Sequence, residues 1–93
     1  MDLKSFMMAE ARRIDKVFKD YGIGAGVIKR GTFGSPGYLC YGLGLGRGVK
    51  VSAVMAIRRE LEERLSGARG QKTPVRFRSL PLGLEVEHPN PAP

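Results

Sequence analysis

Hydrophobic residues recur at intervals of three, four and seven along two segments of this chain. The first segment runs from Leu3 to Tyr21 and the second from Ser52 to about Leu65. This spacing places the apolar side chains on one stripe of an amphipathic α-helix. Asp2 or Ser5 can cap the start of the first helix, and Gly22 can end it, because glycine tolerates the left-handed conformation at a helix end.

Other segments alternate between apolar and polar or small residues, which is typical of strands that bury one face. The clearest is Tyr38–Leu45, and two more, Val75–Ser79 and Leu82–Glu87, read as an antiparallel hairpin around Leu80-Pro81. The segment Ile23–Arg30 is predicted to be a short strand, but its pattern does not show which of its side chains point toward the core. The segment from residue 31 to residue 37 is interpreted as a connection with a tight turn at its proline and glycine.

Glycines occupy alternate positions near the end of the Tyr38–Leu45 strand. Gly42, Gly44 and Gly46 leave nearly bare the face opposite its apolar side chains. Such glycines mark a surface that another backbone or molecule approaches closely, so we predict that these three form a partner interface. A corner at residues 46–48 then leads to Ser52, the predicted N-cap of the second helix.

The predicted order is therefore helix, strand, strand, helix, strand, strand. This order favours an α+β fold, a two-layer sandwich with a mainly antiparallel sheet of about four strands and both helices on one face. We expect one domain over residues 1–88. Residues 89–93 contain three of the six prolines and are expected to be a linker to a following domain.

Composition adds a strong positive charge. The 93 residues carry a formal net charge of +7, which favours an anionic partner, nucleic acid first and an acidic membrane surface second. A single cysteine excludes an internal disulfide and a multi-cysteine metal site, and we expect the reducing cytoplasm as its location. Neither a membrane-spanning segment nor a secretory signal is expected from the pattern.

No cofactor site and no catalytic site emerge from the residues. The glycine series ends at Gly48, but Lys50 does not follow a glycine directly and is separated from Ser52, so a nucleoside-triphosphate loop does not fit. His88, the only histidine, lies beside the proline-rich tail, and Cys40 has no histidine nearby in the sequence. We therefore expect neither a metal nor an enzymatic activity in this chain.

Some basic residues have candidate partners and others do not. Arginines of the second helix can pair with glutamates four positions away, and Arg76 and Arg78 can pair across strands with Glu85 and Glu87. Six cations have no obvious partner and are predicted to contact nucleic-acid phosphates: Lys29, Arg30, Arg47, Lys50, Arg69 and Lys72. The alternative is solvated loop charge without a function.

In their order along the chain, several short motifs resemble the domain that precedes the motor in FtsK/SpoIIIE-type DNA translocases. The motifs are Ser35-Pro36, Tyr41-Gly42-Leu43-Gly44-Leu45, Gly48-Val49-Lys50-Val51-Ser52, Val75-Arg76-Phe77 and Pro89-Asn90. The most specific is the Gly-Val-Lys-Val-Ser corner. The resemblance covers Ala11 to Asn90.

The resemblance implies a non-catalytic assembly module of a hexameric DNA translocase. Domains of this kind form a ring beside the RecA-like ATPase motor, pass motion along double-stranded DNA and serve chromosome segregation and cell division, or plasmid DNA transfer. Nucleotide binding belongs to the motor domain, which this chain does not contain. The alternative is a basic nucleic-acid-binding α+β module that works without a motor.

Overall fold

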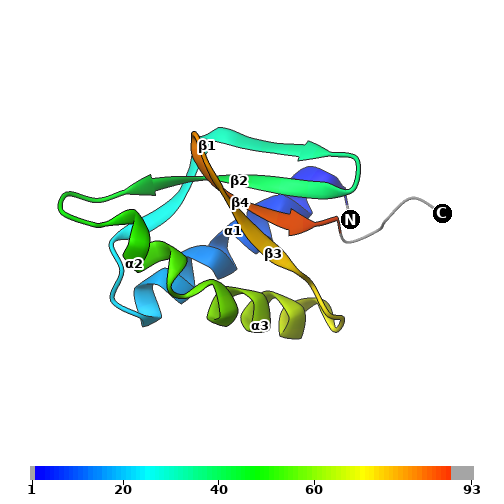
Figure 1. The fold of residues 1–93 in the computed structure, drawn as a ribbon. Coiled ribbons are helices and arrows are strands. Elements are labelled where there is room, and N and C mark those ends of the chain that lie inside the picture. The colour runs from blue at the N-terminus through cyan, green and yellow to red at the C-terminus, as the bar shows by residue number, and fades with distance from the viewer. Residues whose placement is uncertain (1, 89–93) are drawn as a thin grey trace.

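The computed structural model of this protein describes residues 2–88 and contains one antiparallel sheet of four strands. Its strand order is β1-β2-β4-β3, so β1 and β3 are the edges (Figure 1). The strands are β1 (Ala25–Ser35), β2 (Tyr38–Leu45), β3 (Val75–Ser79) and β4 (Leu82–Glu87). The predicted α+β class and the predicted element order are confirmed.

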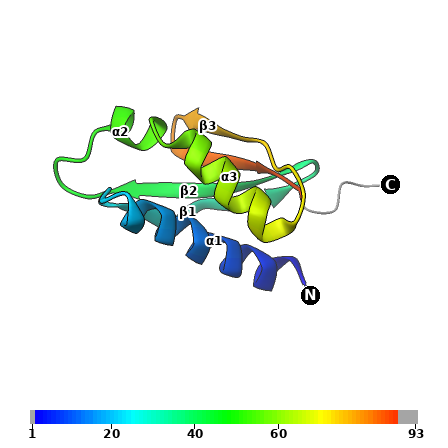
Figure 2. The ribbon, with the colours of Figure 1, turned by 90° about the horizontal axis from the view of Figure 1, so that it is seen from below.

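Three helices accompany the sheet in the described part of the chain. They are α1 (Leu3–Asp20), α2 (Val51–Met55) and α3 (Arg58–Arg69). The two long helices, α1 and α3, lie in front of the sheet when it is seen from below (Figure 2). They pack against each other, and α1 lies against β1 while α3 lies against β3.

The first helix begins and ends as predicted. Asp2 is its N-cap, and its Oδ1 atom accepts a hydrogen bond of 2.7 Å from the backbone N–H of Ser5. This hydrogen bond lowers the pKa of the Asp2 carboxyl. At the other end the chain leaves the helix through Gly22, whose φ of 67° lies in the left-handed region.

The second predicted helix is in fact two helices. It is interrupted at Ala56 and Ile57, and the second part continues to Arg69, past the predicted end near Leu65. Ser52 is not the N-cap; Lys50 holds that position, without a capping hydrogen bond from its side chain. No glycine or proline marks the interruption. Ile57, one of the two residues at the interruption, is part of the core.

The first strand is longer than predicted because part of the expected connection belongs to it. β1 runs to Ser35, and only the two residues 36 and 37 form the turn to β2. The register shifts between Ile28 and Phe33, so four residues of β1 form a bulge opposite Tyr41 of β2. Thr32 stabilises this bulge, since its hydroxyl donates to the carbonyl of Ile28 and accepts from the N–H of Gly42.

The core lies between the sheet and the two long helices. It is formed by the alternating side chains of β2, β3 and β4 and by the apolar stripes of the helices. Its fully or nearly fully buried members are Ile14, Val17, Phe18, Leu39, Tyr41, Leu43, Val54, Ile57, Leu61, Leu65, Val75, Leu84 and Val86. The predicted linker, residues 89–93, lies outside the described residues.

Candidate nucleic-acid interface

The fold neutralises only part of the positive charge. Seven of the 16 lysine and arginine side chains form ion pairs with carboxylates. The other nine have no acidic partner within residues 2–88, which include every charged side chain of the sequence. These nine are Lys4, Arg12, Arg13, Lys19, Lys29, Arg30, Arg47, Lys50 and Lys72. They are the groups that an anionic partner would meet.

Five of the six predicted contact residues are among these nine, but they do not form one cluster. Lys29 and Arg30 lie on the bulge of β1, and both are exposed. Arg47 and Lys50 lie on the β2–α2 connection, and Lys72 lies on the α3–β3 connection. The two connections are at opposite ends of the molecule in Figure 1.

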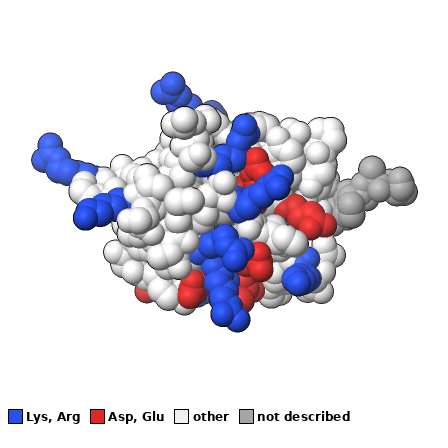
Figure 3. Space-filling model, in the orientation of Figure 1, with Lys and Arg blue, Asp and Glu red and all other residues white. Residues whose placement is uncertain are grey.

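The surface view agrees with this distribution. Basic side chains at the left end of Figure 3, where the β2–α2 connection lies, have no acidic neighbours in that view. Basic and acidic side chains alternate near the centre. The end of the molecule with the β2–α2 connection is therefore the most clearly cationic part of this face.

Arg69, the sixth predicted contact residue, does have a partner, which corrects the expectation that it is unpaired. Its side chain is 4 % exposed, and the guanidinium forms two hydrogen bonds with Glu10, each of 2.8 Å: Nε to Oε2 and Nη2 to Oε1. Nη1 also donates to the carbonyl oxygen of Glu87, and the guanidinium lies over the ring of Phe6, 5.2 Å from the ring centre. Such a bidentate pair leaves little of this cation for an external phosphate.

Tyr41 completes this buried polar cluster of Glu10, Arg69 and Tyr41. Its hydroxyl donates to Oε1 of Glu10 over 2.8 Å, and all three side chains are nearly inaccessible to solvent. Burial, and secondarily the negative charge of Glu10, raise the pKa of the Tyr41 phenol above its usual range. The cluster joins α1, β2 and α3 through side chains that are distant in sequence.

The sequence prediction missed four cations, all on α1. Lys4, Arg12, Arg13 and Lys19 have no acidic partner among the described residues, and all are exposed. They were overlooked because a basic residue on a mixed-charge helix resembles ordinary solvated surface. The sequence did contain a signal, because residues 3–20 include five basic residues and only three acidic ones. In the structure, two of these acids contact groups outside the helix: Glu10 binds Arg69, and Asp15 accepts from the N–H of Val27.

The close approach expected at the glycines is made by the chain itself. A Cβ atom on Gly42 would overlap the carbonyl oxygen of Arg30 in the bulge, and Gly42 is buried. A Cβ atom on Gly44 would lie 2.8 Å from Cγ2 of Ile28, and one on Gly46 would lie 2.9 Å from the carbonyl oxygen of Gly24. The contact of these glycines with a partner stays a prediction.

Of the cross-strand ion pairs expected on the open face of the sheet, those with Glu85 are present, whereas the Glu87 carboxylate pairs with neither Arg76 nor Arg78. Arg76 donates from Nε to Oε1 of Glu85 over 2.6 Å, and Arg78 lies 3.4 Å from Oε2 of the same carboxylate.

The single cysteine, Cys40, lies opposite Glu85 in the register of β2 and β4, and burial raises the pKa of the Cys40 thiol. A thiol with a raised pKa is a poor nucleophile near neutral pH.

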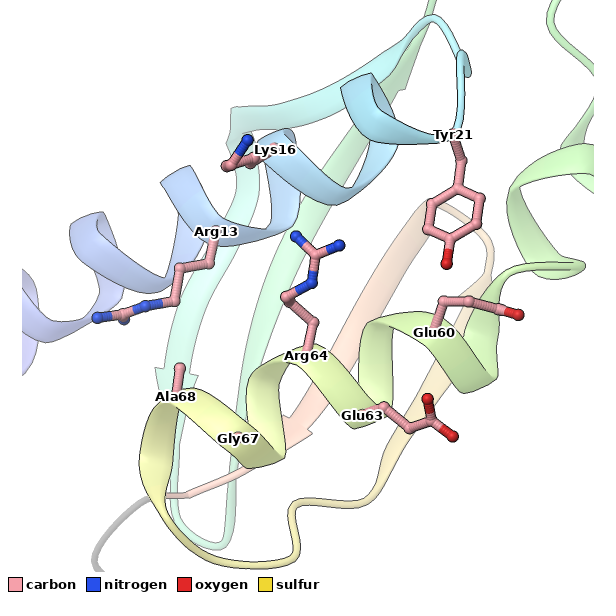
Figure 4. A pocket seen from close by; sticks show the side chains of 8 residues that line it. All are labelled: Arg13, Lys16, Tyr21, Glu60, Glu63, Arg64, Gly67 and Ala68. Atoms are coloured by element: carbon pink, nitrogen blue, oxygen red, sulfur yellow. The ribbon is translucent and has the colours of Figure 1, made fainter.

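A groove with a volume of about 640 Å³ separates α1 from α3 on the helix side (Figure 4). Arg13 and Lys16 line it from α1, and Glu60 and Arg64 line it from α3. Arg64 crosses it and donates from Nη1 to Oδ2 of Asp20 over 3.1 Å, which lowers the pKa of that carboxyl. The pairing of Glu60 with Arg64 that the helix spacing suggests is thus replaced by a pair between helices.

Neither a metal site nor a membrane-spanning helix is found among the residues that the structure describes. Among residues 2–88, no three His, Cys, Asp or Glu side chains come together as ligands for a metal ion. None of the helices in the described range is both long enough and apolar enough to cross a membrane. His88, the last described residue, donates its backbone N–H to the carbonyl of Gly37 over 3.1 Å.

Comparison of the chain with protein-family models, with curated proteins and with solved structures finds no significant match to any of them.

Proposed function

We propose that this chain is a non-catalytic assembly module of a hexameric DNA translocase of the FtsK/SpoIIIE type. In this proposal it forms a ring beside the RecA-like ATPase motor, around double-stranded DNA. The ordered motifs of the sequence suggest this role. The observation that supports it most is the set of nine cations without acidic partners, because phosphate contact needs such cations and no particular base sequence.

The distribution of these cations suits backbone contact better than base readout. Arg47 and Lys50 extend from one connection, and Lys29 and Arg30 extend from a strand bulge. Residues in connections reach phosphates without a helix entering the major groove. We therefore expect binding that depends strongly on salt and weakly on sequence.

The buried polar cluster supports the mechanical part of the proposal. A module that passes motion from a motor to DNA must keep its shape between its two contact surfaces. Arg69 holds α3 to α1 through Glu10 and to the end of β4 through the carbonyl oxygen of Glu87. In a medium of low dielectric these charge-assisted hydrogen bonds are strong, so the helices and the sheet should move as one body.

Duplex binding at several salt concentrations tests the DNA contact. The logarithm of the affinity should fall linearly with the logarithm of the salt concentration, with a slope of about −0.9 for each phosphate contact. Replacing Arg47 and Lys50 by alanine should make that slope shallower by about 1.8, if both contact phosphates. The matched control is Arg59→Ala, which removes an exposed arginine that already has a partner in Glu63.

Reconstitution tests the assembly role. The chain is mixed at low salt with the RecA-like motor domain of a translocase of this type and with duplex DNA, and the complex is followed by analytical ultracentrifugation. We expect co-sedimentation as a hexameric ring. Absence of any association with the motor would overturn the translocase proposal.

The second candidate is a basic nucleic-acid-binding module without a motor partner. It rests on the same unpaired cations and needs no ring. It predicts tight, salt-sensitive duplex binding by the chain alone, together with no association with the motor domain. The two experiments above therefore separate the candidates.

A further inference from the structure

A second groove lies between the N-terminal half of α1 and the bulge of β1, and the proposed DNA contact does not account for it. It has a volume of about 740 Å³. Its walls are mostly apolar: Leu3, Met7 and Met8 come from α1, and Phe33 comes from β1. Lys4 and Lys29 line it as well. We call it the α1–β1 groove.

This groove gathers exposed apolar side chains. Leu3 is 42 % exposed, Met8 is 52 % exposed and Phe33 is 41 % exposed, so three of the eight large hydrophobic residues that are exposed in residues 2–88 line one site. Isolated exposed apolar residues are ordinary, but a contiguous group in a concavity is typical of a binding surface. Methionine is suited to such a surface because its unbranched side chain adapts to different shapes.

We propose that the α1–β1 groove binds an amphipathic helix of a partner protein, with an apolar face and acidic flanks. The charge of the groove selects acidic flanks. Lys4 and Lys29 have no acidic partner among residues 2–88, and a carboxylate on either side of an apolar helix face could pair with each of them. The apolar side chains of the partner helix would repeat about once per turn. This spacing matches the groove, whose lining side chains extend along α1 for roughly two turns.

A second copy of this chain fits the groove poorly. Each chain has few carboxylates to offer to Lys4 and Lys29 of another copy, because seven of its nine acidic side chains already bind a cation or a backbone N–H. These seven are Asp2, Glu10, Asp15, Asp20, Glu62, Glu63 and Glu85.

The edge of β1 favours a helix over an added strand. The N–H of Val27 already donates to Oδ1 of Asp15 over 2.7 Å, and the bulge at residues 29–32 interrupts the regular spacing of the strand. A partner strand needs a regular row of unpaired N–H and C=O groups, which this edge does not offer. Duplex DNA fits poorly for another reason, since only Lys4 and Lys29 of the lining are cations and the other walls are mostly apolar.

The test uses a defined probe with the full chain. The probe is a fluorescein-labelled helical peptide of about 15 residues that carries leucine on one face and glutamate on both flanks. Two control peptides keep its length, one with alanine in place of leucine and one with lysine in place of glutamate. Binding is measured by fluorescence anisotropy, and the site is located from backbone amide shifts in ¹⁵N-labelled protein.

We expect the acidic leucine peptide to bind and to shift amides of residues 3–11 and 29–33. Met8→Ser should weaken binding by more than about fivefold, and Lys29→Glu by about threefold to tenfold. Leu80→Ser is the matched control, because Leu80 is 90 % exposed and lies outside the groove. Circular dichroism confirms that each variant is folded.

Several results would overturn the proposal. They are no binding of the acidic peptide at millimolar concentration, equal binding of the lysine peptide, and binding that Met8→Ser leaves unchanged. Vesicles of acidic phospholipid and a 20-base-pair duplex are tested in parallel. Amide shifts confined to the groove with either of them, and none with the peptide, would assign the groove to that ligand instead.

Discussion

An arginine–carboxylate pair lies on each side of the sheet, one between the covering helices and one on the open face, and the two pairs have opposite surroundings. On the helix-covered face, the closest atoms of Arg69 and Glu10 are 2.8 Å apart, and the two side chains are 4 % and 1 % exposed. On the open face, Arg76 and Glu85 approach to 2.6 Å, while the arginine is 77 % exposed. The distances are similar, so the burial of the arginine is the main difference.

This difference in burial decides how much each ion pair can contribute to the stability of the fold. Water weakens the attraction across the open face and solvates Arg76 whether or not Glu85 is present, so such a pair is worth little. The buried pair has strong mutual attraction and a large desolvation cost, and these two terms nearly cancel. Its importance appears when one partner is removed, because the other then remains as an uncompensated buried charge.

The largest expected effect follows from removing one member of the buried pair. Arg69→Met leaves the Glu10 carboxylate with only the Tyr41 hydroxyl as a donor, among the side chains that now bind it. We expect the free energy of unfolding to fall by about 3–5 kcal/mol. Urea denaturation followed by circular dichroism measures this change.

A double variant shows whether the charge is the cause. Glu10→Leu combined with Arg69→Met removes both charges and keeps most of the volume. It should be more stable than Arg69→Met alone, because no unpaired charge stays buried. If both variants lost the same stability, the packing of Arg69 on Phe6 would explain the effect instead of electrostatics.

The open face has a different weak point, the backbone contact at Gly42. Gly42→Ala should lower the free energy of unfolding by up to about 3 kcal/mol, because the new methyl group overlaps the Arg30 carbonyl oxygen and the bulge must move. The matched control is Gly67→Ala within α3, where nothing lies within 4 Å of the added atom. That substitution should stabilise the protein by about 0.5–1 kcal/mol. Equal effects at the two glycines would contradict the proposed overlap.

Local patterns predicted much of this fold. The period-two alternation of β2 and of the β3–β4 hairpin placed the right side chains in the core, and it also predicted the pairing of Arg76 with Glu85. The apolar stripe and the caps of α1 gave its two ends. These features depend on residues a few positions apart, so the sequence contains them directly.

The buried pair could not be predicted in this way. Glu10 and Arg69 are separated by 59 positions, and no local pattern joins them. A signal was present in each helix nevertheless: Glu10 lies four residues before Ile14, and Arg69 lies four residues after Leu65, so each charge continues an apolar stripe. Because an unpaired buried charge is costly, two opposite charges on the buried stripes of different helices are expected to form an ion pair with each other.

The bulge of β1 was missed for a different reason. Residues 29–34 contain two cations and two glycines and show no alternation, which is typical of a connection. The bulge depends on Thr32, whose hydroxyl replaces a missing ladder hydrogen bond at Gly42.

For the candidate interface, the sequence identified five cations that lack an acidic partner, but the fold alone showed that the sixth, Arg69, has one.

Tyr41 offers a pH-dependent test of the buried side. Tyr41→Phe should lower the free energy of unfolding by about 1.5 kcal/mol at pH 7, because Glu10 loses a donor. The phenol's pKa is raised in the folded protein, whereas the unfolded phenol ionises near pH 10. Above pH 10 the unfolded state therefore binds fewer protons, and stability falls as the pH rises, by at most about 1.4 kcal/mol per pH unit.

The contribution of Tyr41 to this pH dependence is isolated by comparing the free energy of unfolding of the wild type and of Tyr41→Phe at each pH. All other ionisable side chains are present in both proteins, so their contributions cancel in this difference. Tyr41→Phe should thus be less sensitive to pH between 10 and 11 than the wild type. Parallel pH profiles would mean that Tyr41 ionises normally in the folded protein.

The smallest expected effect is on the open face, and it completes the comparison of the two ion pairs. Glu85→Gln removes the carboxylate that Arg76 and Arg78 share, yet both arginines keep contact with water. We expect a loss of at most about 1 kcal/mol, and we expect 1 M sodium chloride to remove most of the difference because salt screens exposed charges. The same salt should leave the loss caused by Arg69→Met almost unchanged, since ions do not reach the buried carboxylate. If salt reduced both losses alike, the two pairs would be in similar surroundings, and burial could not explain their different contributions to stability.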